Sequence, residues 1–174
     1  MIVCGCTDNP ASSFVVTEQI EIGNSGVIVS YPVDWFLAEV SLTPNLANPR
    51  EVFSVGSFPL RPGGPNCAQV PSNALHDMRP GDVLVSVQER FDAIASGFPD
   101  RPDRFGPAPG TTDNELYGCL DPEESDDIGA IHWIWFTDQD RYFHVIVALG
   151  SDVGGEREKA AWAVLDDLVI APAD

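Results

Sequence analysis

The chain has 174 residues, of which 44% are apolar and 21% are charged, with 9 Lys and Arg against 27 Asp and Glu. This composition is typical of a globular protein, because disordered acidic chains carry fewer apolar residues. The net charge of −18 argues against nucleic acid as a partner, since phosphate binding needs clustered Lys and Arg. No apolar run reaches the about 18 residues of a membrane-spanning helix.

The first half of the chain has the patterns of β-strands. Alternating or β-branched apolar runs predict strands over residues 14–22, 27–31, 36–42 and 51–58. Gly23-Asn-Ser-Gly26 predicts the turn between the first two strands. The Pro- and Gly-rich stretch 59–65 ends the last of them.

The second half continues with a short helix over 71–78 and a strand over 82–89. Two runs, 131–137 and 141–149, flank Asp138-Gln-Asp140 and predict a hairpin. Because this hairpin is apolar on both faces, we expect it at the centre of a sheet. The apolar stripe of residues 156–168 predicts a final helix.

The order of these elements defines the expected fold. Strands that cluster, rather than alternate with helices, indicate the α+β class with an antiparallel sheet and flanking helices. Residues 98–129 show no periodicity and predict a long irregular insert, either a functional loop or a covering segment. We expect a single domain over residues 14–171, with residues 1–13 either disordered or the remnant of a lipoprotein signal.

The four cysteines bear on the cellular compartment. Cys67 and Cys119 both lie in turn-rich sequence, and in an oxidising compartment they could form a disulfide worth about 4 kcal/mol. In the cytosol they would be two unpaired thiols. One residue separates Cys4 from Cys6, whereas the cysteines of a zinc-binding pair are separated by at least two residues. The sequence therefore assigns no metal and no cofactor.

The N-terminal Val3-Cys4-Gly5-Cys6 resembles the end of a bacterial lipoprotein signal, which makes Cys6 the candidate for lipidation. A complete signal also has a basic region and an apolar region of roughly 7–15 residues, but only three residues precede Cys4. Either the true start codon lies upstream or the match is coincidental. This pattern slightly favours the cell envelope over the cytoplasm.

Negative charge is concentrated in one short run. It comprises five carboxylates, Asp121, Glu123, Glu124, Asp126 and Asp127. The run is interpreted as a solvated loop, with a surface for a basic partner and a Ca²⁺ site as alternatives. It lacks the ladder of carboxylates followed by glycine that an EF-hand has, so we assign it no metal.

Two segments carry a resemblance to a known group. Val-Ile-Val-Ser-Tyr-Pro-Val-Asp-Trp at 27–35 and Trp-Ala-Val-Leu-Asp-Asp-Leu-Val-Ile at 162–170 resemble the opening strand and closing helix of the PsbP-like fold group. The middle of the chain, from Ser41 through Cys67, resembles small uncharacterised actinobacterial proteins. The first resemblance implies an antiparallel sheet between helices. Members of the group bind partners as different as a small GTPase and a photosystem, and no motif for either role is present, so the resemblance implies fold alone.

Catalytic motifs are sparse in the sequence. His132 and His144 could form a metal site or an acid–base pair if the hairpin register brought them together, and otherwise they are independent imidazoles. His76 is expected to face solvent. The sequence contains no nucleophile elbow, no P-loop and no dinucleotide-binding fingerprint.

The four tryptophans, Trp35, Trp133, Trp135 and Trp162, favour core packing, with a stacking groove for a sugar or peptide as the alternative. Trp133 and Trp135 should share one face of their strand. We therefore expect a non-catalytic binding or structural module of the bacterial cell envelope, with a protein as its partner. The alternatives are an acidic cytoplasmic immunity or inhibitor-type protein that binds a basic partner and, third, a hydrolase. The oligomeric state does not follow from the sequence.

Overall fold

The computed structural model of the protein describes residues 15–38, 40–43, 45–64, 69–91, 97–107 and 126–172. Within these ranges the chain forms two antiparallel sheets and two helices. The elements in chain order are β1 (Thr17–Glu21), β2 (Val27–Pro32), β3 (Phe36–Leu37), β4 (Arg50–Gly56), α1 (Ser72–Asp77), β5 (Val83–Arg90), β6 (Ile128–Asp138), β7 (Arg141–Gly150), α3 (Gly155–Asp166) and β8 (Val169–Ile170).

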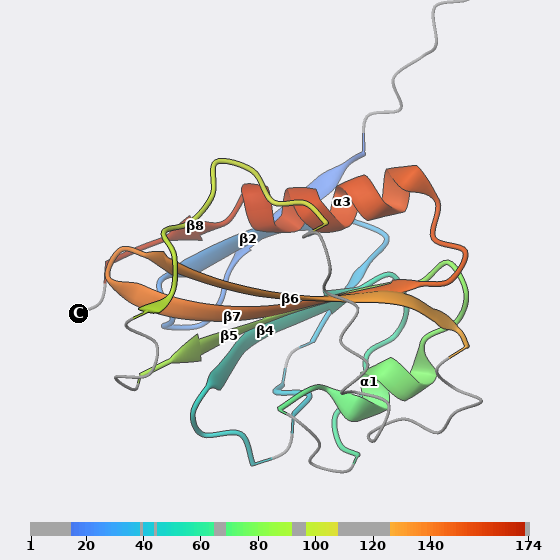
Figure 1. The fold of residues 1–174 in the computed structure, drawn as a ribbon, viewed down its shortest axis with the longest axis horizontal. Helices are drawn as coiled ribbons and strands as arrows, with labels where there is room; N and C mark the ends of the chain where they lie inside the picture. The colour runs from blue at the N-terminus through green and yellow to red at the C-terminus, as the bar shows by residue number, and fades with distance from the viewer. Residues whose placement is uncertain are drawn as a thin grey trace, which may run out of the picture.

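The larger sheet forms the middle layer of the molecule. Its five strands follow the order β3-β4-β5-β7-β6, and the smaller sheet has the order β1-β2-β8. Helix α3 and the smaller sheet lie on one side of the larger sheet, and α1 lies on the other (Figure 1). The larger sheet is therefore covered on both faces, which agrees with the apolar composition of its central strands.

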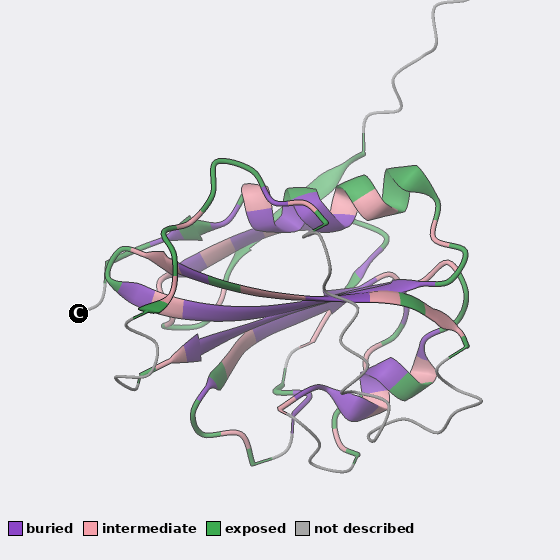
Figure 2. Cartoon of the chain, in the orientation of Figure 1, coloured by how far each residue is buried: buried purple, intermediate pink, exposed green. Residues whose placement is uncertain are grey.

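The two faces of the larger sheet belong to two hydrophobic clusters. Val85 of β5 and Val147 of β7 face α3 and the smaller sheet. Leu84 and Ile146 point to the opposite face, where they pack with Leu75 of α1. The inner strands are buried along most of their length (Figure 2). This alternation follows from the two-residue period of a β-strand.

The α+β class predicted from the sequence is confirmed, and several details differ. Two sheets form instead of one, and the strand expected over 36–42 is limited to β3. The hairpin was expected to be central, but only β7 is central and β6 is an edge strand. Strand β6 begins at Ile128, inside the stretch expected to be irregular.

The outer edge of β6 is covered locally by the preceding chain. Thr137 donates its backbone N–H to Pro99 at 2.7 Å and accepts one from Arg101 at 2.9 Å. The Arg101 guanidinium also donates to the carbonyls of Leu165, Asp166 and Leu168, at the C-terminal end of α3. One loop therefore pairs with β6 at Thr137 and caps the C-terminal end of a helix.

Candidate functional site

The face of the larger sheet that is turned toward α1 has two unlike halves. Beneath α1 it is apolar, with Leu84, Ile131 and Ile146 packed into the core. Beyond α1 the same face carries polar and aromatic side chains. We call this second region the polar half-face. Its central residues are Ser54, Ser86, Gln88, Trp133, Trp135 and His144, and the register places Arg90, Thr137 and Tyr142 next to them on the same face.

Three rings form a stack at the centre of the polar half-face. The His144 imidazole stacks against the indoles of Trp133 and Trp135, with centroid separations of 4.9 and 5.5 Å and interplanar angles of 18° and 5°. Cross-strand pairing places Trp135 directly opposite His144. His144 is only 4% exposed, whereas Trp135 is 40% exposed. His144 is therefore the most buried of the three rings, Trp133 is partly buried and Trp135 is exposed.

The polar half-face contains buried hydrogen-bonding atoms without partners. Gln88 lies opposite His144 on the neighbouring strand and is fully buried. Its amide nitrogen donates to the Gln69 carbonyl at 2.8 Å. In the part of the chain that the structure describes, no partner is found for Gln88 Oε1, for either ring nitrogen of His144, or for Trp133 Nε1. Each such atom costs about 1–3 kcal/mol, so four of them in one region call for an explanation.

The His144 imidazole is uncharged at neutral pH. Burial lowers its pKa to about 4, and the positive charge of Arg90 lowers it in the same direction. A neutral imidazole donates one hydrogen bond and accepts another. The ring is therefore suited to a ligand group that both donates and accepts a hydrogen bond.

A hydrogen-bond network lies at the β4 end of the polar half-face, although the buried Thr43 hydroxyl has no partner among the described residues. The Glu51 carboxylate accepts hydrogen bonds from the Ser41 hydroxyl, the Thr43 backbone N–H and the Ser54 hydroxyl at 2.9, 2.9 and 2.7 Å. The hydroxyls of Ser54 and Ser86 are 2.9 Å apart. Because Ser54 has one proton and donates it to Glu51, Ser86 donates to Ser54. This network fixes the end of the half-face at β4 and β5.

The histidine pair considered from the sequence does not form. His132 lies on the opposite face of the sheet, where its ring packs against Trp162 at a centroid distance of 5.2 Å. Burial lowers the pKa of His132, and the nearby Glu158 raises it by a smaller amount. The described residues also contain no group of three or more His, Cys, Asp or Glu that could hold a metal ion. His76 is exposed, as expected.

The tryptophans divide into two pairs. Trp35 and Trp162 are 7% exposed and belong to the core, as the sequence favoured. Trp133 and Trp135 share one strand face, also as expected, but they form part of the polar half-face.

The register that creates this stack does not follow from the sequence pattern. Gln139 and Asp140 both have positive φ, 51° and 58°, and form a two-residue turn. The turn pairs Asp138 with Arg141, so Trp135 must pair with His144. The sequence suggested a three-residue connection, which left the register open.

Most other predicted site residues cannot be placed. Cys6, Cys67, Cys119 and three of the five acidic residues, Asp121, Glu123 and Glu124, lie outside the described residues, so the lipidation and disulfide hypotheses stay predictions. Of the other two, Asp126 is exposed, and Asp127 lies 3.7 Å from the Arg79 guanidinium. That ion pair is largely exposed and contributes little to stability.

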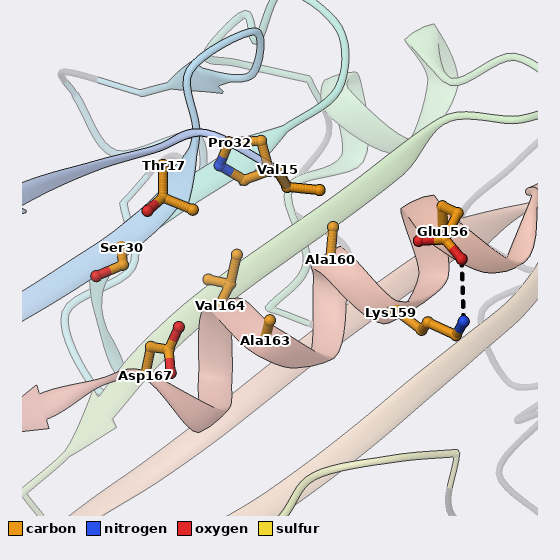
Figure 3. Close-up of a pocket in the computed structure, with 10 residues that line it drawn as sticks. All are labelled: Val15, Thr17, Ser30, Pro32, Glu156, Lys159, Ala160, Ala163, Val164 and Asp167. Carbon is orange, nitrogen blue, oxygen red and sulfur yellow. Dashed lines mark hydrogen bonds and ion pairs between the residues drawn. The ribbon is translucent and has the colours of Figure 1, made fainter. Parts of the chain in front are cut away.

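A groove lies elsewhere, between α3 and the first two strands. It has a volume of about 170 Å³, and Val15, Pro32, Ala160 and Val164 are among the residues that line it (Figure 3). An ion pair between Glu156 and Lys159 at 3.0 Å lies along its helix side. Its lining is mostly apolar and offers few groups that could orient a ligand, so the polar half-face is the stronger candidate.

Comparisons with known proteins give no relative: no family model, no curated protein and no solved structure matches this chain. Within the described ranges, no helix is both long and apolar enough to cross a membrane.

Proposed function

We propose that the protein is a non-catalytic binding module of the bacterial cell envelope and that the polar half-face binds its ligand. The observation that carries this proposal is the pair Gln88 and His144. They are adjacent across two central strands, are 0% and 4% exposed, and have three unpartnered polar atoms among the described residues. A ligand that binds these atoms would recover their hydrogen-bonding energy.

The surroundings of His144 favour binding over proton transfer. A histidine that acts as a general base lies within hydrogen-bond reach of a nucleophile, and a second group orients its ring. Within the described residues, neither ring nitrogen of His144 has such a partner, and the ring stacks against the indoles of Trp133 and Trp135. The ring is therefore held rigidly and presents its nitrogens as hydrogen-bonding groups.

We also propose that the chain has the PsbP-like fold. An antiparallel sheet between α1 on one side and α3 on the other supports this assignment. The fold alone identifies no ligand. The cell-envelope location is supported by the sequence pattern at Cys6, and a Cys67–Cys119 disulfide is expected if the protein is in that oxidising compartment. The intact mass of protein from its native host, with thiols alkylated before and after reduction, tests the location directly: lipid mass and two thiols that appear only on reduction would support it.

The binding function is tested by thermal unfolding with a panel of small molecules that contains amino acids, nucleosides, saccharides and short lipids. A ligand at ten times its Kd stabilises the folded state by about 1.4 kcal/mol, which raises Tm by roughly 3–6 °C for a chain of this size. Trp135→Ala should abolish the shift. Phe36→Ala is the matched control, because Phe36 is a similarly exposed aromatic residue, at 44%, on the strand at the opposite edge of the same sheet. A panel that shifts neither the parent nor the control would refute the proposal.

The net charge of −18 supports the alternative, an acidic protein that binds a basic partner. Charge of this size accelerates encounter with a cationic surface, and the effect weakens as salt is added. Association rates that stay constant from low to high salt would count against this alternative.

A further inference from the structure

Strand β1 lies at an open edge of the smaller sheet. Its only strand partner among the described residues is β2, and each of its residues is exposed (Figure 2). A strand whose outer backbone groups are unpaired is a template for another extended chain. The outer edge of β1 is therefore a surface on which a further strand can be added.

The phase of the β1–β2 ladder determines which backbone groups face this edge. Ile22 donates its N–H to the Val27 carbonyl at 2.9 Å, and Val33 donates its N–H to the Val16 carbonyl at 3.1 Å. Bonded and non-bonded pairs alternate along an antiparallel ladder, so the even-numbered residues of β1 bond β2 and the odd-numbered ones face outward. Within the described ranges no hydrogen bond is found for the outward backbone groups, which belong to Thr17, Gln19 and Glu21.

The side chains of β1 are complementary to a basic strand. Glu18 and Glu21 are its charged residues, and it contains no Lys or Arg. Glu18 accepts a hydrogen bond from the Tyr31 hydroxyl, and a carboxylate can accept several. Val16 and Ile20, which are 66% and 39% exposed, flank Glu18 on the same face. A strand with Lys or Arg opposite Glu18 and apolar residues on either side of that position would match both the charge and the apolar surface.

We propose that the outer edge of β1 binds an extended, basic segment of a partner protein by strand addition. Main-chain hydrogen bonds to the outward groups would hold the segment, and its alternate side chains would provide specificity. A second copy of this chain is a poorer occupant, because it also carries a charge of −18 and its own β1 offers no cation. The smaller sheet and the polar half-face lie on opposite sides of the larger sheet, so this proposal and the ligand site can fail independently.

Amide hydrogen exchange of the full chain, measured by NMR, tests the proposal. The probe is the capped peptide Lys-Val-Thr-Lys-Thr-Val, whose antiparallel pairing places its two lysines opposite Glu21 and Glu18. In the free protein, the amides of Thr17, Gln19 and Glu21 should exchange rapidly because they face solvent. A saturating concentration of the peptide should slow their exchange by about tenfold or more, because each gains a hydrogen bond.

Methylation of the peptide backbone checks the register. An N-methyl group on the third residue, opposite Gln19, removes an N–H that points at β1 and should abolish the protection. An N-methyl group on the fourth residue, opposite Glu18, lies on the side away from β1 and should leave binding intact.

Charge exchange checks the choice of partner. Glu18→Lys combined with Glu21→Lys should weaken binding of the basic peptide by about tenfold and create binding of Glu-Val-Thr-Glu-Thr-Val. The matched control is Asp103→Lys combined with Asp152→Lys, which changes the net charge equally at exposed positions outside β1. This control should bind the basic peptide like the parent.

Three results would overturn the proposal. Slow exchange of the outward amides in the isolated monomer would show that the chain itself covers this edge. Protection that develops without peptide as the protein concentration rises would identify a second copy as the occupant. No protection by the basic peptide, or equal protection by the two methylated peptides or by the acidic one, would reject strand addition of a basic segment.

Discussion

Protonation of His144 should destabilise the folded protein as the pH falls. The pKa of this residue drops from an ordinary value of 6.5 to about 4, chiefly because the ring is buried. Between pH 4 and pH 6.5 the His144 ring is protonated in the unfolded chain but not in the folded chain. Its contribution to the free energy of unfolding is therefore fully present above pH 6.5 and decreases as the pH falls toward 4. At about 1.4 kcal/mol per pH unit, the whole decline is about 3 kcal/mol, of which about 2 kcal/mol falls between pH 7 and pH 5.

Urea unfolding at a series of pH values measures this effect, with His144→Gln as the comparison. Other groups also weaken the fold in acid: the pKa of His132 is lowered by burial, and that of Asp77 is lowered by its hydrogen bond to Arg61. Both contributions remain in the variant and cancel in the difference. The parent should therefore lose about 2 kcal/mol more than His144→Gln between pH 7 and pH 5. Parallel pH curves for the two proteins would refute the argument that His144 is buried and neutral.

Three further substitutions test the framework that holds the site. Arg101→Ala removes the hydrogen bonds to the last carbonyls of α3 and the ion pair with Asp138. It should lower the free energy of unfolding by about 1–3 kcal/mol in urea titrations. An unchanged midpoint would contradict the capping role. The Arg141 guanidinium contacts the buried Glu89 carboxylate at 2.6 Å. Arg141→Met leaves this carboxylate with one partner fewer and should lower the free energy of unfolding by about 3–5 kcal/mol in the same assay. A loss below 1 kcal/mol would show that this carboxylate is hydrated. Gly150→Ala places a methyl group 2.6 Å from the Arg79 carbonyl and should lower Tm through overpacking. A Tm within 1 °C of the parent would show that the backbone at Arg79 can move.

The part of the fold that could be predicted from the sequence is the part set by local pattern. Strand β5 has valine at every second position, and its neighbour β7 has the run Val145-Ile-Val147, and such β-branched strands are recognisable wherever they pair. Strand β8 is two residues long and pairs only with β2, so no local pattern marks it. The pairing of Thr137 with the segment around Asp100 joins residues more than 30 apart in the chain, which no periodicity reveals.

The candidate site could not be predicted from the sequence, for a related reason. Its residues are ordinary in isolation, and only the sheet order and register bring Gln88, His144 and Trp135 into one row. The register depends on two non-glycine residues with positive φ, Gln139 and Asp140. Because the usual Asn-Gly or Asp-Gly signal is absent, a turn of two residues and one of three were equally compatible with the sequence.

The energetic position of the polar half-face is the strongest argument that it has a function. The polar atoms of Gln88, Trp133 and His144 that have no partner among the described residues together cost several kcal/mol, against a total stability of about 5–15 kcal/mol for a typical domain. Leucine or phenylalanine at such positions would complete the apolar surface that begins beneath α1. The polar half of this face therefore lowers the stability of the protein at positions where packing does not require polar residues. This is the expected trade-off when the polar atoms of Gln88, Trp133 and His144 serve to bind a ligand.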